Sequence, residues 1–243
     1  MNWSGKRPVL HRSVYSRFVL KGDMLMDDSI KVAVVTGGHR FDVPNFHGLF
    51  RQIEGVDAYI QSLEDFASPR AEERDFYDAV VFYNMHKEGP TDENRPGWMG
   101  RPLSALESWL ATGKGVVLLH HAILAFPNWD PWVQMAGVVA GSFESFSHDE
   151  AMRIAVEDRD HPITRGLSDW EMIDETYVMG EPDADSHLLL TTDHPVCMKS
   201  IGWTRQYNDT RVFCFQSGHD NQTWKDENFQ SVLMRGIQWV SGR

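Results

Sequence analysis

Four histidines follow apolar segments that are typical of β-strands. The histidines are His39, His86, His120 and His219. The segments before them span residues 31–36, 79–83, 116–119 and 212–216. Imidazole transfers protons near neutral pH and is a common zinc ligand. Because ligands bind beyond the carboxyl ends of the strands in an open parallel sheet, we expect the four histidines to line one cleft. Taken singly, each histidine favours a structural or solvent-facing role, and it is the occurrence of four at strand ends that favours a functional cluster. Four other histidines are expected outside the cleft: His11, His148, His187 and His194.

Glu175 is the acidic candidate for the same chemistry. It belongs to Asp174-Glu175-Thr176, between a tryptophan-containing segment and a predicted strand. A carboxylate there could complete a metal site, orient a histidine or act as a base. The alternative interpretation is a solvated acid in a loop.

The two cysteines, Cys197 and Cys214, lie inside predicted strands, which favours buried, unreactive side chains. A cysteine nucleophile would need the sharp turn that follows a strand. After residues 116–119 that position is taken by His120-His121, so a cysteine hydrolase is disfavoured. Two thiols also do not make a disulfide framework, and the expected location is therefore the reducing cytoplasm.

The charge balance restricts the partners. The chain has 23 basic and 35 acidic side chains, a formal net charge of -12. Such a surface repels phosphate backbones, so we expect no nucleic-acid partner. No apolar run approaches the ~20 residues of a membrane span, so we expect no membrane partner either.

The strands and helices that must position these residues can be read from hydrophobic periodicity. Up to residue 120 the order is β-α-β-β-α-β. It consists of the strands before His39, His86 and His120, a strand at residues 56–60, and helices at 45–53 and 102–111. This order predicts a mostly parallel sheet with helices on both faces. Later strands are interpreted as antiparallel additions and edge strands, and residues 229–240 as a closing helix. The later strands span residues 152–156, 176–179, 187–190, 196–203 and 212–216.

A length of 243 residues with 42% hydrophobic side chains suits one large domain, which we place at residues 30–243. Residues 1–29 are interpreted as an N-terminal arm, since the first 22 contain five basic and no acidic side chains. Such an arm would pack on the body or on a neighbouring subunit. The second arrangement would require a homo-oligomer.

Several motifs together resemble the ThuA-like, or trehalose-utilisation, family. In chain order they are VVTGGH (34–39), GKGVVLLHHA (113–122), HPITRGLSDWEMIDETY (161–177), RVFCFQSGHD (211–220) and RGIQWV (235–240). The resemblance implies a flavodoxin-like, three-layer α/β fold related to class I glutamine amidotransferases, without their catalytic cysteine. It also implies a role in the breakdown of trehalose and related disaccharides, alongside dehydrogenases that form 3-keto sugars.

The resemblance also implies a site. Some relatives look able to bind zinc through strand-end histidines, which places a divalent metal, zinc above others, on His86, His120 and His219. His121 is the alternative to His120, because neighbouring side chains of a strand point to opposite faces. The catalytic residues expected beside the metal are His39, His121 and Glu175. Histidines that bind sugar hydroxyls without a metal are the competing interpretation.

Two classes of function remain open at this stage. The first is a metal-dependent isomerase, lyase or hydrolase that acts on a small-molecule sugar or keto sugar. The second is a non-catalytic sugar-binding or regulatory protein on the same scaffold, because a fold alone does not determine function.

Overall fold

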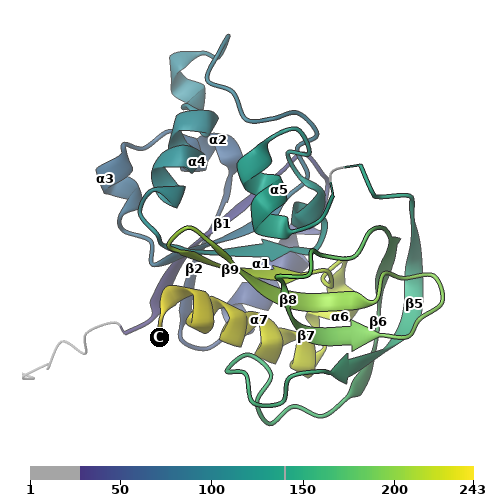
Figure 1. The fold of residues 1–243 in the computed structure, drawn as a ribbon. Coiled ribbons are helices and arrows are strands. Elements are labelled where there is room, and N and C mark those ends of the chain that lie inside the picture. Colours follow the sequence, from purple (N-terminus) through teal and green to yellow (C-terminus); the bar gives the residue numbers. More distant parts are fainter. Residues whose placement is uncertain (1–27, 140) are drawn as a thin grey trace, which may run out of the picture.

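The computed structural model describes residues 28–139 and 141–243, which form a nine-stranded sheet covered by helices (Figure 1). The strand order is β2-β1-β3-β4-β9-β8-β7-β5-β6. The strands are β1 (Ile30–Gly37), β2 (Val56–Ser62), β3 (Ala79–Asn84), β4 (Gly115–Leu119), β5 (Ser145–Val156), β6 (Trp170–Val178), β7 (His187–Thr192), β8 (Ser200–Tyr207) and β9 (Thr210–Phe215). The expected arm at residues 1–29, with His11, lies outside the described residues except for its last two.

The helices connect and cover these strands. The α-helices are α1 (Val43–Gln52), α2 (Leu63–Ala67), α3 (Ala71–Arg74), α4 (Pro102–Leu110), α5 (Asp130–Ala136), α6 (Asn221–Trp224) and α7 (Glu227–Ser241). Two short 3-10 helices are η1 (Gly97–Met99) and η2 (His120–Leu124). Within the described ranges, no helix combines the length and apolarity that crossing a membrane requires.

The parallel half of the sheet has the flavodoxin-like order β2-β1-β3-β4-β9. Alternate residues of its strands face two separate apolar cores. Val32 and Val81 pack with α1 and α7, whereas Ala33 and Val80 pack with α2, α4 and α5. Figure 1 shows these two groups of helices on opposite faces of the sheet. The predicted three-layer α/β fold is confirmed.

The second half of the sheet is antiparallel and extends it beyond β9. β8 pairs with β9 and β7, and β5 pairs with β7 and β6. Residues of β5 and β6 line one cavity together with the segments that follow the parallel strands. The added antiparallel strands are therefore part of the same sheet.

Several details differ from the sequence prediction, among them the pairing of β9 and two short helices. β9 is antiparallel to β8, as expected, but it also pairs in parallel with β4 and so continues the parallel half. The local hairpin is visible in the sequence, whereas the pairing with the distant β4 is not. The helices α2 and α3 were not predicted, because segments of five and four residues are too short to show helical periodicity.

Candidate functional site

A cavity of about 690 Å³ lies at the carboxyl edge of the parallel strands. Its walls come from the segments after β1, β3, β4 and β9 and from the facing strands β5 and β6. The side chains on its walls that are suited to proton transfer or hydrogen bonding include His39, His121, His148, Glu175, Tyr177 and His219. The cavity is thus at the edge of the sheet where ligands of this fold bind.

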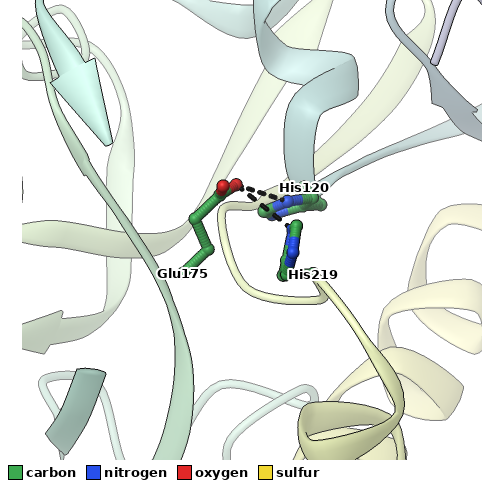
Figure 2. A group of neighbouring side chains, drawn as sticks. All are labelled: His120, Glu175 and His219. Atoms are coloured by element: carbon green, nitrogen blue, oxygen red, sulfur yellow. Dashed lines mark ion pairs between the residues drawn. The ribbon is translucent and has the colours of Figure 1, made fainter. Parts of the chain in front are cut away.

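The carboxylate of Glu175 lies among three imidazoles. Its Oε2 is 3.0 Å from Nε2 of His120 and 3.4 Å from Nδ1 of His219 (Figure 2). Its Oε1 is 3.1 Å from Nδ1 of His148. Glu175 is an interior residue of β6, and its side chain is only 8% exposed. It is therefore a buried group of the site and not a solvated acid in a loop.

His120 is the first residue after β4, and its backbone φ is 55°. This left-handed conformation is uncommon for a residue other than glycine, and it turns the chain sharply from β4 into η2. The Nδ1–H group donates to the carbonyl oxygen of Gln216 at 2.7 Å. Nε2 is left facing Glu175 and the hydroxyl of Tyr177, which is 2.9 Å away. That nitrogen can therefore hold a second proton, accept from Tyr177 or bind a metal.

Main-chain hydrogen bonds fix the relative positions of these groups. Asp174, the neighbour of Glu175 in β6, accepts the N–H groups of Gly218 and His219 at 2.8 and 3.0 Å. Nε2 of Gln216 donates to the carbonyl oxygen of Glu175 at 2.9 Å. β6 and the segment after β9 are thereby joined on both sides of the cluster.

His148 enters the site through a bulge in β5. Ser147 pairs with Thr176 and Glu150 with Asp174, so two residues of β5 lie opposite the single residue Glu175. A bulge of this kind redirects side chains, and here it brings His148 to the carboxylate. The expectation that His148 lies outside the cavity is wrong. The bulge has no signature in the residue pattern from which the strand was predicted.

The environment drives the pKa values of two cavity histidines apart. Burial lowers the pKa of His39, a shift that its backbone hydrogen bond only partly opposes. Burial also acts to lower the pKa of His219, but the hydrogen bond and negative charge of Glu175 outweigh it and raise that pKa. For Glu175, burial alone would raise the pKa, whereas hydrogen bonds from His120 and His219 bring it below its usual range. The carboxylate is therefore ionised at neutral pH.

The other predicted site residues divide between two cavities. His121 lines the main cavity, its Nδ1–H donates to the carbonyl oxygen of Asn84 at 3.3 Å, and burial lowers its pKa to about 2. His86 instead lines a neighbouring cavity of about 280 Å³ and stacks on Phe126 with 5.4 Å between ring centroids. The predicted ligand set is thus separated: His120 and His219 meet Glu175, and His86 lies outside this group.

The glycines before His39 allow the chain to pass close to β3. Gly38 has φ +72°, and a Cβ at this position would be 2.6 Å from the carbonyl carbon of Met85. Any other residue would be strained and would displace the segment after β3. A glycine at position 38 is therefore required by packing at the edge of the cavity.

Residues 32–240 match the family model described as ThuA, trehalose utilisation. The chain belongs to the ThuA family. No curated protein sequence matches it. The role associated with this family is in sugar metabolism.

Solved structures agree with the fold of a ThuA protein. A protein of Parabacteroides merdae described as ThuA-like is 20% identical, with a TM-score of 0.67 over 88% of this chain and 90% of that one. A cytoplasmic protein of Salmonella typhimurium is 14% identical, with a TM-score of 0.62 over 87% and 99%. PurLQS of Thermotoga maritima is also 14% identical, with a TM-score of 0.56 over 87% and 99%. At these identities the likeness concerns the fold alone.

In this ThuA protein the sharp turn after β4 carries His120 where a cysteine hydrolase would need its nucleophile. Cys214 is fully buried within β9. Cys197 lies in the turn before β8 and not inside a strand, contrary to the sequence prediction, because that strand begins only at Ser200. Burial raises the pKa of both thiols, that of Cys197 to about 11. Neither is suited to act as a nucleophile.

The donor set of the ThuA site fits a divalent metal. Ligand atoms of His120, Glu175 and His219 lie within 4.8 Å of one another. Zinc bonds of about 2.1 Å imply ligand–ligand separations of about 3.4 Å in a tetrahedron, close to the 3.0 and 3.4 Å found around Glu175. A metal-binding histidine usually donates a hydrogen bond from the ring nitrogen that does not bind the metal. The bond from Nδ1 of His120 to the carbonyl oxygen of Gln216 is of this kind.

Four contributors to the ThuA site were not predicted from the sequence: His148, Asp174, Tyr177 and Gln216. Tyr177 lies two residues after Glu175 in Asp-Glu-Thr-Tyr, and alternation along a strand would have placed its side chain on the same face as the candidate acid, whereas Asp174 belongs to the opposite face. Gln216 ends the apolar segment before His219, which was a second available signal. His148 had none.

Proposed function

We propose that the protein is an enzyme of carbohydrate breakdown that transfers protons to and from a small sugar. The sugar is trehalose, a related disaccharide, or the 3-keto derivative of one of these. The observation that carries this proposal is the ionised, buried Glu175 held among His120, His148 and His219 in a cavity of about 690 Å³. The trehalose-utilisation family supports a sugar as substrate. A cavity of this size is within the usual range for small-molecule sites.

The two cavity histidines with opposite pKa shifts have complementary roles. His39 is neutral at neutral pH because burial lowers its pKa, so it accepts a proton. His219 keeps its proton to higher pH because Glu175 raises its pKa, so it donates one to a sugar oxygen. Titratable groups driven apart in this way are the usual sign of an acid–base pair. Applied to a keto sugar, the pair removes a hydrogen beside the carbonyl and protonates the carbonyl oxygen.

The same side chains would hold a metal, with His120, Glu175 and His219 as ligands. A bound zinc ion would polarise a carbonyl oxygen and stabilise the negative charge that develops on it. His219 would then be a ligand and not the acid. His39 and His148, which line the cavity without belonging to the ligand group, would remain free to move the proton.

Hydrogen exchange tests this proposal without requiring the natural product to be known. The protein is incubated in D₂O with 3-keto-trehalose or 3-keto-glucose, and NMR follows the hydrogens on either side of the carbonyl. We expect catalysed exchange by the unmodified protein and loss of at least ~100-fold in rate for Glu175→Gln, as for removal of an acid–base group. The matched control is Glu171→Gln, an exposed residue of the same strand.

If exchange is no faster than in buffer while the protein still binds the sugar tightly, the protein is a sugar-binding or regulatory protein and not an enzyme. Equal exchange by the unmodified protein and Glu175→Gln would remove Glu175 from the mechanism. Both measurements are made with and without added zinc and with chelator, so that the metal-assisted and metal-free forms are compared directly.

A further inference from the structure

A second cavity, distinct from the one that His86 lines, adjoins the cavity that holds Glu175. Its volume is about 250 Å³, and it lies between η2, α5, the segment before β5 and the end of β6. Its apolar lining includes Ile123, Leu124, Trp132, Val133, Val138 and Met179. Lys87 and Phe143 line both cavities, so the second cavity lies directly beside a ligand bound in the Glu175 cavity.

The lining of this second cavity is poorly suited to a sugar ring. Of its described side chains, Lys87 has the one charged group, and it stands at the boundary with the Glu175 cavity. The indole N–H of Trp132 is already donated to the carbonyl oxygen of Ala122 at 2.8 Å. A buried hydroxyl without a partner costs about 1–3 kcal/mol. A second sugar with several hydroxyls would therefore bind this cavity unfavourably.

The dimensions and surroundings suit an apolar group instead. An apolar protein cavity of about 150 Å³ is large enough to bind benzene, so about 250 Å³ accommodates a substituted ring or branched alkyl chain. Aromatic side chains continue from the second cavity to the charged cluster. The ring of Phe143 is 5.5 Å from Tyr177 and 6.5 Å from Phe146, and Phe146 is 5.0 Å from His148.

We propose that this cavity binds the aglycone of a glycoside, an aryl or branched alkyl group, while the sugar part occupies the cavity of Glu175. The assignment rests on the proposed function in one respect, that the Glu175 cavity binds a sugar. It goes further by identifying the substrate class as glycosides with one apolar part. A second sugar in this position is the competing outcome.

Binding measurements distinguish the two. Phenyl glucoside, methyl glucoside and trehalose are titrated into the protein by calorimetry, with both anomers of each glucoside. Because burying a phenyl ring contributes about 1.5–3 kcal/mol, we expect a phenyl glucoside to bind at least ~10-fold more tightly than its methyl counterpart. Trehalose binding more tightly than either phenyl glucoside would overturn the proposal, as would equal affinities of phenyl and methyl glucosides.

Variants that fill the cavity locate the effect. Val133→Phe and Leu124→Phe each add a ring at a partly exposed wall residue, and we expect the phenyl-to-methyl affinity ratio to fall to about one third of its original value or less. Val196→Phe, at an exposed turn residue outside the cavity, is the matched control and keeps the ratio. An unchanged ratio in both filled variants, with their thermal unfolding unaltered, contradicts the assignment. Absence of catalysed deuterium exchange together with a retained phenyl preference counts against the proposed function and supports the apolar site.

Discussion

Oδ2 of Asp174 accepts the main-chain N–H of Gly218 at 2.8 Å, across 44 positions of sequence. Oδ1 of the same carboxylate accepts the N–H of His219 at 3.0 Å. Asp174 is buried, and its chain neighbour Glu175 faces the imidazoles. One acid of the Asp-Glu pair therefore fixes the segment after β9, and the other takes part in the charged cluster.

Replacing Asp174 by Asn tests this positioning role. The amide can accept one of the two N–H groups but directs its own NH₂ toward the other, leaving a buried donor unpaired. We expect the free energy of unfolding to fall by about 1–3 kcal/mol in urea titrations. The rate of deuterium exchange should fall as well, because His219 is no longer held at Glu175.

A structural role alone would lower stability without changing the exchange rate of the folded variant. Asp174→Glu, which keeps a carboxylate but on a longer side chain, provides the comparison. The measurement is made under conditions in which Asp174→Asn is fully folded. If it then catalyses exchange as fast as the unmodified protein, the positioning role is wrong.

His148 offers a separate test because its side chain is 50% exposed. Removing it as His148→Ala takes one partner from Oε1 of Glu175, and we expect the exchange rate to fall about 10-fold or more. Unfolding should change little, because the side chain of His148 is itself half exposed and Glu175 keeps His120 and His219 as partners.

The matched control is His187→Ala. His187 is 55% exposed and lies 2.9 Å from the carboxylate of Asp158, outside the cavity. Equal loss of exchange in the two variants would mean that His148 acts through general stability and not through Glu175.

Site residues that directly follow a strand can be predicted from the sequence, whereas those placed by contacts between distant segments cannot. The apolar segments before His39 and His120 predicted strands of the parallel sheet, the segment before His219 predicted a further strand, and the acidic Asp-Glu-Thr stretch indicated Glu175. The position of His86 could not be inferred, because it depends on the path of the chain after β3. Its ring stacks on Phe126, and Asn84 donates to its Nδ1 at 3.1 Å.

The bulge in β5 shows the same limit. The first half of β5 is largely exposed and polar, so it lacks the alternation from which a strand is predicted. Its pairing with β6, and the extra residue that directs His148 to Glu175, are properties of the assembled sheet. By contrast, the three-layer fold depends on long apolar segments and amphipathic helices, which the sequence displays directly.

Zinc binding separates the ligand set found in the structure from the one expected from the sequence. Calorimetry of metal-free protein, purified without a histidine tag, should give about one site per chain. His120→Ala, His219→Ala and Glu175→Gln should each weaken zinc binding by at least ~10-fold. His86→Ala should retain the affinity of the unmodified protein, because His86 lies outside the ligand group. Loss of affinity in His86→Ala, with folding intact by circular dichroism, would restore the set expected from the sequence. Failure of the unmodified protein to bind zinc would leave the metal-free acid–base pair.

The pH dependence of thiol modification tests the exclusion of a cysteine nucleophile. Burial raises the pKa of Cys197 from its ordinary value of 9.0 to about 11, and Cys214 is fully buried. The thiolate is the reactive form, so a higher pKa means less of it at a given pH: at pH 8 the thiolate fraction of Cys197 is lowered about 100-fold. Iodoacetamide should therefore modify the native protein far more slowly than a free thiol at pH 8, with the rate rising steadily as the pH approaches 11. Mass spectrometry at timed intervals gives the rate for each cysteine, and the urea-unfolded protein provides the reference for exposed thiols.

Deuterium exchange should survive in Cys197→Ala and Cys214→Ala, the latter with about 1 kcal/mol of stability lost for a small buried side chain. Rapid, stoichiometric alkylation near neutral pH that abolishes exchange in the folded protein would contradict this prediction and return the cysteine hydrolase to consideration.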